Sequence, residues 1–200
     1  MVDNIFKEYG NNPAILFHKW HAEAEKSEIN DPNAMALATV DKEGRPEVRM
    51  VLLKVVDESG FTFFTNLESA KAEALQTHPY AALNFHWKSL EKQIRISGPV
   101  VKTTDEENDK YFASRSRASR LGAWASSQSR PCEDYSTFEK LVAKAEKKFA
   151  GQEVPRPQHW GGFRVMPERM EFWLGHPDRL HKRFVYTKQD KDWTAHWLFP

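Results

Sequence analysis

The strongest constraint on the fold is a series of short apolar runs separated by compact turn signals. Turns such as Asp41–Gly44 and Asp57–Gly60 each end in a glycine, which tolerates the positive φ that tight turns need. The expected strands are Ala34–Asp41, Pro46–Val56, Phe61–Thr65, Tyr80–Trp87, Glu91–Thr103, Gly162–Leu174, Leu180–Thr187 and Trp193–Leu198. This spacing favours a closed or nearly closed antiparallel barrel. Strands and helices do not alternate regularly, which disfavours a doubly wound parallel sheet.

Helix signals flank and interrupt the strands. Asn12 as N-cap and Pro13 as first residue predict a helix with Leu16, Phe17, Trp20 and Ala24 on its apolar face. We expect further helical segments at Ser69–Thr77, from Thr104 through Arg115, at Ser119–Ala125 and from Ser136. Thr104–Glu107 and Ser136–Glu139 both have the capping-box pattern. The last helix is expected to carry Phe138, Leu141, Val142, Ala145 and Phe149 on one face, with a loop at Gly151–Gln158.

Length and charge narrow the class of protein. Two hundred residues favour one domain over 1–200: an N-terminal helical segment (1–30), first barrel strands (34–103), a helical insert (104–150) and C-terminal strands (160–200). There are 29 Lys and Arg against 28 Asp and Glu, so no basic bias favours nucleic acid or an anionic membrane. The mean hydropathy is −0.69, and no apolar run approaches the roughly 18 residues of a membrane span.

Cysteine content and the chain start indicate the compartment. A single cysteine, Cys132, excludes an internal disulfide and a cysteine-rich metal site. The first ten residues lack the basic and apolar regions of a secretory signal. We therefore expect a cytoplasmic protein. The eight histidines show no metal-ligand spacing, so we expect no metal site.

Two cationic groups could bind an anion. Arg179, His181 and Arg183 lie at every second position of an expected strand, which would place all three on one face. That arrangement suits an anionic ligand, and the alternative is an exposed barrel edge kept soluble by charge. Residues 111–130 carry Arg115, Arg117, Arg120 and Arg130 but no acid, with Tyr111 and Ser119 among them. Such a stretch suits a phosphate monoester, and the alternative is a solvated basic helix face.

Other polar positions are less decisive. Gln93 alternates with Ile94 on an expected strand and could contact the edge of a heterocyclic ring or simply face solvent. Arg49 and Lys54 have opposite parity, so both reach one ligand only if the strand bulges or the ligand wraps its end. Trp173 and Trp124 could contact a cofactor, but tryptophans in such positions are more often core residues.

Taken together, ordered sequence motifs over nearly the whole chain resemble the pyridoxamine 5′-phosphate oxidase family. The motifs are Ala34-Met-Ala-Leu-Ala-Thr-Val-Asp41, Arg49-Met-Val-Leu-Leu-Lys54, Phe64-Thr-Asn-Leu67, Leu90-Glu-Lys-Gln93, Gly122-Ala-Trp-Ala-Ser-Ser-Gln-Ser129, Trp160-Gly-Gly-Phe-Arg164, Glu171-Phe-Trp173 and Arg179-Leu-His-Lys-Arg183. The resemblance implies a mainly β, FMN-binding split β-barrel with Greek-key-like antiparallel strands and peripheral helices. It also implies a homodimer with FMN at the subunit interface.

The resemblance further implies a reaction and its residues. Pyridoxamine or pyridoxine 5′-phosphate would be oxidised to pyridoxal 5′-phosphate by hydride transfer to FMN, and O₂ would reoxidise the flavin to give H₂O₂. The implied FMN-binding residues are Arg49, Lys54, Phe64, Thr65, Lys71, Gln93, Gln128, Ser129, Trp173 and Arg183. The implied substrate-binding residues are Lys54, Tyr111, Arg115, Ser119, Arg179 and His181, of which Arg179 and His181 would be catalytic.

The chain also departs from the family pattern. Ala70 stands where an arginine is usual, Leu174 replaces a glutamine, Lys182 an acid and Trp197 an arginine. The N-terminal segment is short, and only Lys7–Tyr9 suggests the usual substrate-covering stretch. These differences keep two alternatives open. One is a related split-barrel flavoenzyme acting on another small aromatic, and the other is a non-enzymatic binder of FMN or pyridoxal phosphate.

Overall fold

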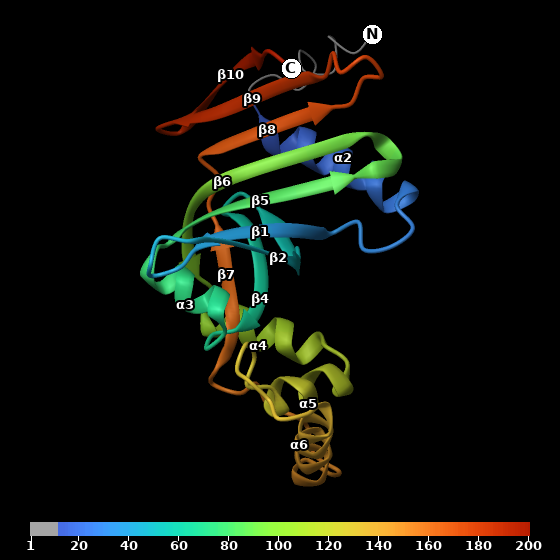
Figure 1. The fold of residues 1–200 in the computed structure, drawn as a ribbon, viewed down its shortest axis with the longest axis vertical. Helices are drawn as coiled ribbons and strands as arrows, with labels where there is room; N and C mark the ends of the chain where they lie inside the picture. Colours follow the sequence, from blue (N-terminus) through green and yellow to red (C-terminus); the bar gives the residue numbers. More distant parts are fainter. Residues whose placement is uncertain (1–11) are drawn as a thin grey trace.

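A computed structural model describes residues 12–200, which form one curled antiparallel sheet with helices on one side and at one end (Figure 1). The strands are β1 (Ala34–Val40), β2 (Pro46–Leu52), β3 (Val55–Asp57), β4 (Gly60–Asn66), β5 (Tyr80–Trp87), β6 (Lys92–Lys102), β7 (Trp160–Val165), β8 (Arg169–Leu174), β9 (Lys182–Gln189) and β10 (Asp192–Leu198). The helices are α2 (Pro13–Ser27), α3 (Ala70–Thr77), α4 (Asp105–Ser114), α5 (Arg117–Ala125), α6 (Tyr135–Lys148) and the 3₁₀ turn η1 (Lys88–Leu90). Lys7–Tyr9 lie outside the described residues.

The sheet curls because β6 changes partners along its length. Strands β10-β9-β8-β6-β5-β1-β2 are hydrogen-bonded in that order. The first part of β6 pairs with β8, while residues 100–102 pair with β7, which in turn pairs with β4. Near the change, a Cβ on Gly98 would lie 1.8 Å from the Met166 carbonyl oxygen, so only glycine allows this approach. This half-barrel confirms the expected antiparallel barrel class.

Two predicted strands are each divided in two. Pro46–Val56 breaks at Leu53 and Lys54, where the chain leaves β1 and the Lys54 amide donates to the Thr62 carbonyl of β4. Gly162–Leu174 breaks at residues 166–168, whose amides at Met166 and Glu168 donate to β6 carbonyls. The sequence did not reveal either break, because the residues on both sides of each break are partly buried and keep the apolar pattern continuous.

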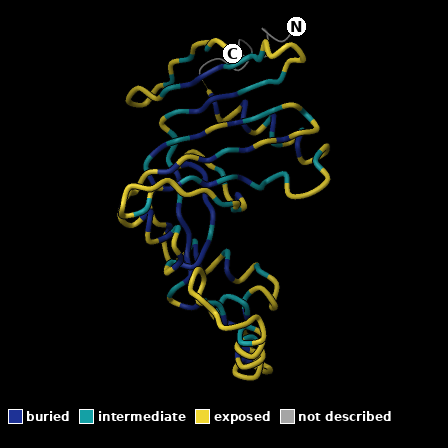
Figure 2. The backbone as a smooth tube through the Cα atoms, in the orientation of Figure 1, coloured by how far each residue is buried: buried dark blue, intermediate teal, exposed yellow. Residues whose placement is uncertain are grey.

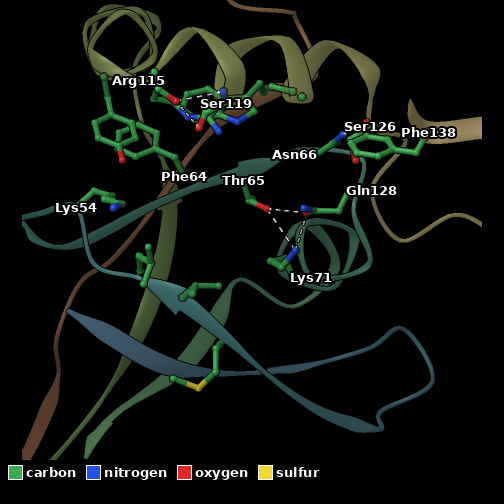
Figure 3. Close-up of a pocket in the computed structure, with 18 residues that line it drawn as sticks. Lys54, Phe64, Thr65, Asn66, Lys71, Arg115, Ser119, Ser126, Gln128 and Phe138 are labelled. Atoms are coloured by element: carbon green, nitrogen blue, oxygen red, sulfur yellow. Dashed lines mark hydrogen bonds between the residues drawn. The ribbon is translucent and has the colours of Figure 1, made fainter. Parts of the chain in front are cut away.

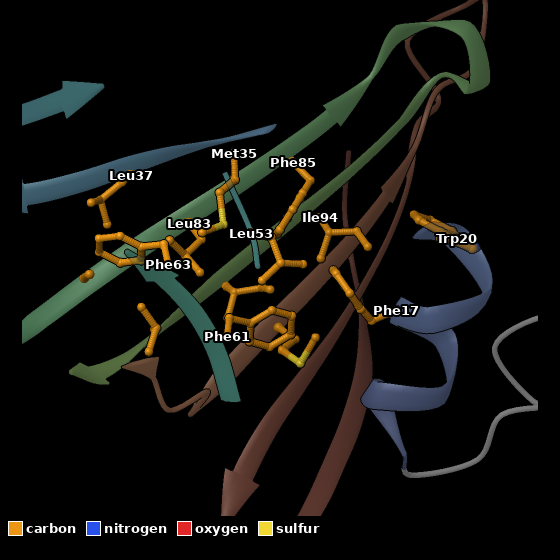
Figure 4. Close-up of a cluster of buried hydrophobic side chains, with 14 of the residues drawn as sticks. Phe17, Trp20, Met35, Leu37, Leu53, Phe61, Phe63, Leu83, Phe85 and Ile94 are labelled. Carbon is orange, nitrogen blue, oxygen red and sulfur yellow. The ribbon is translucent and has the colours of Figure 1, made fainter. Parts of the chain in front are cut away.

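The core lies between α2 and the concave side of the sheet (Figures 2 and 4). Asn12 caps α2 by accepting from the Ala14 amide, as predicted, and Leu16, Phe17, Trp20 and Ala24 are buried. The Phe17 ring meets Phe61 edge-on at 4.8 Å and Phe85 at 5.3 Å. Helices α4, α5 and α6 lie at the opposite end of the sheet (Figure 1).

The last predicted helix begins earlier than its sequence signal suggested. Asp134, and not Ser136, is the N-cap of α6, because its carboxylate accepts from the Thr137 amide. Of the predicted apolar face, Ala145 and Phe149 pack with Leu121 and Val154 in a small second cluster. Leu141 is exposed and Phe138 lines a cavity, so this face is only partly a core face.

Candidate active site

A cavity of about 750 Å³ lies where the β2–β3 break, β4, α3, α4 and α5 meet (Figure 3). Eight residues predicted for the site line it: Lys54, Phe64, Thr65, Lys71, Tyr111, Arg115, Ser119 and Gln128. The break after Leu52 is what brings Lys54 into the cavity. Three of the lining residues are cations, and the described lining contains no carboxylate. The cavity is therefore built for an anion.

Arg115 lies against aromatic rings and not against an acid. Its guanidinium carbon is 4.8 Å from the Trp160 ring centre and 5.5 Å from that of Phe112. Its Nη1 is buried and has no hydrogen-bond partner within residues 12–200. Burial lowers the pKa of this guanidinium, which Tyr111 partly opposes. An aromatic face stabilises a cation without using its N–H donors, so these donors stay available for a ligand.

The rings beside Arg115 form a stack along the cavity wall. Phe64 lies parallel to Tyr111 at 4.2 Å and to Trp160 at 5.4 Å between ring centres. The stack positions Tyr111 on α4 against β4 and β7. Sequence reasoning did not identify Trp160 as a site residue, although it lies at the start of one of the quoted motifs.

Hydroxyl groups at the start of α5 face the same cavity. Ser116 caps α5, accepting from the Ser119 amide at 3.3 Å, and its hydroxyl donates to the Ser119 hydroxyl at 2.9 Å. Both serines line the cavity next to Arg115. Ser116 was missed in the sequence, where an N-cap serine three residues before Ser119 was the available signal.

A second part of the lining centres on Lys71. Its Nζ donates to Gln128 Oε1 at 2.8 Å and to Thr65 Oγ1 at 3.3 Å (Figure 3). Burial, and then the charge of Arg49, lower the pKa of Lys71. Arg49 itself does not line the cavity, because its guanidinium bonds Thr39 Oγ1 at 2.6 Å and Glu47 Oε2 at 2.5 Å.

The four arginines of residues 111–130 do not all contribute positive charge to the cavity. Arg117 donates to the Phe149 and Gln152 carbonyls after α6, and Arg120 pairs with Glu153 at 2.7 Å. Arg130 pairs with Glu73. Of the four arginines only Arg115 lines the cavity. The residues of this stretch that could bind a phosphate in the cavity are therefore Arg115, Ser119 and Tyr111.

The remaining predicted residues gather on the sheet, away from the cavity. Gln93, Trp173 and Arg183 are direct cross-strand neighbours on β6, β8 and β9, and the His181 ring lies 4.5 Å from that of Trp173. None of these four lines the cavity. Figure 1 places β8 and β9 at the far end of the molecule from α4 and α5.

Arg179 precedes the strand on which it was predicted. β9 begins at Lys182, and Arg179 adopts a left-handed backbone with φ of +59°. His181 also precedes β9, so the period-2 argument for a shared strand face fails for both Arg179 and His181. Ser129 is also left-handed, with φ of +69°, and lines a neighbouring cavity that shares Ser126, Gln128 and Phe138 with the first. Strained non-glycine residues of this kind gather at functional sites.

Arg183 is held by a buried acid. Glu171, only 1% exposed, accepts from Arg183 Nε at 2.8 Å and from Arg169 at 2.9 Å, with Arg95 at 3.4 Å. Arg183 Nη1 also donates to the Phe199 carbonyl at 3.1 Å. Burial alone would raise the pKa of Glu171, but the bonds from Arg183 and Arg169 hold it below its ordinary value.

The described residues contain neither a metal-binding cluster nor a membrane-spanning helix. Residues 12–200 contain no group of three or more His, Cys, Asp or Glu arranged to hold a metal ion. Within the same range, every helix is too short or too polar to cross a bilayer.

The curled sheet, the end cap of helices and the cationic cavity lined by aromatic rings define a split-barrel protein. The chain belongs to the pyridoxamine 5′-phosphate oxidase family. Residues 22–149 match the family model of that description, and residues 160–200 match the model of the pyridoxine 5′-phosphate oxidase C-terminal dimerisation region.

Individual relatives agree with this assignment. The chain is 56% identical over 189 residues to pyridoxine/pyridoxamine 5′-phosphate oxidase of Gluconobacter oxydans, covering 94% of each chain. PhzG of Burkholderia lata, solved with tetrahydrophenazine-1-carboxylic acid, is 33% identical with a TM-score of 0.91, covering 98% of this chain and 97% of that one. A pyridoxamine 5′-phosphate oxidase-related, FMN-binding protein of Nostoc punctiforme shares the fold at 18% identity, with a TM-score of 0.75 over 96% of this chain and 100% of its own.

Proposed function

We propose that this protein is an FMN-dependent oxidase that converts pyridoxamine or pyridoxine 5′-phosphate to pyridoxal 5′-phosphate. The observation that carries the proposal is Arg115, a half-buried arginine whose buried Nη1 has no partner in residues 12–200, in a cavity whose described lining holds no acid. A buried cation without a counter-ion is costly, and a phosphate ester supplies the missing charge and acceptors. The 56% identity to a named oxidase of these substrates supports the same reading.

The residues present fit FMN as cofactor. Lys71, with Thr65 and Gln128 around its ammonium group, would hold the phosphate end, and Arg49 adds positive charge nearby. The row of Gln93, Trp173 and Arg183 offers an amide, an indole face and a cation for a flat polar ring. Bound FMN would accept a hydride from the substrate and pass the electrons to O₂, giving H₂O₂.

The chain's own residues would bind and orient the substrate. Arg115, Ser119, Tyr111 and Lys54 would hold its phosphate, because all four line the cavity without competing acids. The Phe64–Tyr111 stack covers one wall and limits the water that reaches it. Arg179 and His181 would fix the pyridine ring. Holding the ring in one orientation is what lowers the barrier to hydride transfer.

The proposed site needs two chains. Trp173 and Arg183 lie on β8 and β9, and Arg179 and His181 lie in the segment just before β9, whereas the phosphate-binding residues lie in the cavity. A two-fold homodimer would bring the sheet residues of one protomer to the cavity of the other. The match of residues 160–200 to a dimerisation region supports this arrangement.

A second candidate is oxidation of a different small aromatic, as the likeness to PhzG suggests. A carboxylate could also pair with Arg115, but a phosphate ester carries more negative charge and three acceptor oxygens for the three cations that line the cavity, which favours the phosphate ester. The two candidates therefore separate on whether a phosphate group is required.

Anaerobic mixing tests the proposal. FMN-loaded protein is mixed with pyridoxine 5′-phosphate, pyridoxamine 5′-phosphate, unphosphorylated pyridoxine or a reduced phenazine carboxylic acid. We expect bleaching of the flavin absorbance with the two phosphate esters only. Bleaching with the phenazine alone would favour the second candidate. No bleaching with any of them, despite tight binding of pyridoxal 5′-phosphate, would show a binder and not an enzyme.

A further inference from the structure

A four-residue turn before β9 connects the two residues proposed to hold the substrate ring. The Arg179 amide donates to the His176 carbonyl at 3.1 Å, which closes the turn. The His176 amide donates to Nδ1 of His181 at 3.2 Å. The carbonyl of His176 thus bonds to Arg179, and its amide bonds to His181. The left-handed Arg179 backbone is the conformational cost of closing this turn.

We propose that this turn fixes the tautomer of His181, so that its ring carries its hydrogen on Nε2 and presents that N–H as a donor. A nitrogen that accepts a hydrogen bond cannot carry a hydrogen, so the neutral ring must be protonated at Nε2. The Trp173 ring, tilted by 39° to that of His181 with ring centres 4.5 Å apart, packs against the imidazole and restricts its rotation. The main-chain amide of His176 is the positioning group, and its side chain takes no part in the bond.

The assigned tautomer restricts what His181 does in the reaction. As an Nε2–H donor it binds an acceptor atom of the substrate ring, such as an ionised ring hydroxyl. It does not remove a proton from the substrate at that nitrogen. This inference rests on the proposed oxidase function for its catalytic meaning, but the tautomer itself is a property of the folded chain.

Nitrogen NMR of histidine-labelled, FMN-loaded protein tests the tautomer directly. The His181 signals are assigned by their loss in His181→Gln. We expect Nδ1 to show the shift of an unprotonated nitrogen and Nε2 that of a protonated one. His176→Ala is the matched control, since it removes the side chain and keeps the amide, and it should leave the His181 signals unchanged. A protonated Nδ1, or an even mixture of tautomers, would overturn the proposal.

Two amide substitutions test the catalytic meaning. In His181→Gln the side-chain amide nitrogen reaches the position of Nε2, whereas in His181→Asn it reaches only that of Nδ1. We expect flavin reduction by pyridoxine 5′-phosphate to be roughly tenfold faster in the glutamine variant, about the worth of one hydrogen bond. A faster asparagine variant, or two variants equally devoid of reduction, would contradict the donor role. If the wild-type protein shows no reduction at all, the proposed function fails while the NMR result still decides the tautomer.

Discussion

Four arginines within residues 115–130 carry the same charge but have different surroundings. Arg117 and Arg120 bond to carbonyls and to Glu153 beyond α6, and Arg130 bonds to Glu73. Arg115 instead rests on Trp160 and lines the acid-free cavity, and its buried Nη1 has no partner in residues 12–200. Arg120 also has a buried Nε without a partner in this range, but its guanidinium is paired with Glu153 and does not line the cavity. A cation supported by an aromatic face keeps its full charge toward a ligand, whereas an ion pair neutralises it.

Arg115→Gln should therefore impair substrate binding selectively. Loss of a charged hydrogen bond to phosphate should raise the KM for pyridoxine 5′-phosphate by roughly 10- to 150-fold. FMN affinity, measured by fluorescence titration, should change little. Arg120→Gln is the matched control and should keep the wild-type KM, because Arg120 faces Glu153. Equal effects of the two substitutions would show that Arg115 acts only through the general positive field.

Ala70 gives a prediction in the opposite direction. It is the exposed first residue of α3 and precedes Lys71, whose ammonium group is proposed to hold the FMN phosphate. Ala70→Arg should tighten FMN binding by about tenfold or more, because a guanidinium adds a charge-assisted bond to phosphate. Ala70→Gln is the uncharged control. The gain should shrink in high salt, and identical FMN affinities of the two variants would refute the contact.

At the scale of elements, the β6–β8–β9 part of the sheet is joined by one buried carboxylate. Glu171 on β8 contacts Arg95 on β6 and Arg183 on β9, in addition to Arg169 on its own strand. The three arginines are partly exposed, with side-chain exposures of 54%, 27% and 37% respectively. The carboxylate therefore orders three strands while the charges beside it still reach solvent.

Glu171→Gln should lower the free energy of unfolding by about 2–3 kcal/mol, at or below the lower end of the range for a fully buried pair, because its arginine partners are partly exposed. The pKa of Glu171 is lowered in the folded protein, so its contribution is complete above the ordinary glutamate pKa of about 4.3. It is lost as pH falls through the folded value. In urea titrations the wild type should therefore exceed the variant by a constant amount from pH 7 to about 5, and by less under more acidic conditions.

Glu153→Gln is the control for this experiment. Its carboxylate is 89% exposed beside Arg120, so its removal should change stability little at any pH. A difference between wild type and Glu171→Gln that stays constant through acid pH would show that the glutamate acts through packing and not through its charge.

At the scale of the whole molecule, the proposed site residues divide between the two ends of the chain's fold (Figure 1). Mixed dimers test whether the ends of two chains meet. Arg115→Gln and Arg179→Ala should each abolish most activity as homodimers. After the two are unfolded together and refolded, half of the dimers should be mixed, each with one intact site of two. Activity should then recover to about a quarter of wild type.

The mixed-dimer experiment is informative only if mixed dimers do form. Differently tagged chains would be purified sequentially to confirm that mixed dimers form. If they form and remain inactive, the two groups of residues do not share a site across the interface. Recovery would also support the expectation of a single domain over 1–200, with both ends of the chain contributing to one function.

Much of the fold was determined by the sequence itself. The N-cap at Asn12, the capping box at Thr104 and the strand at Tyr80–Trp87 all form as predicted. Such signals act through φ, ψ and side-chain direction within a few residues, so local sequence is sufficient to set them. The family resemblance likewise named eight residues that line one cavity.

Only the tertiary structure decided which charges remain available and where strands break. Arg117 and Arg120 bond to groups more than thirty residues away. Lys54 enters the cavity because the chain leaves β1 after β2 and continues beside β4. Such outcomes depend on contacts between segments far apart in the chain, and no local pattern of residue types encodes them.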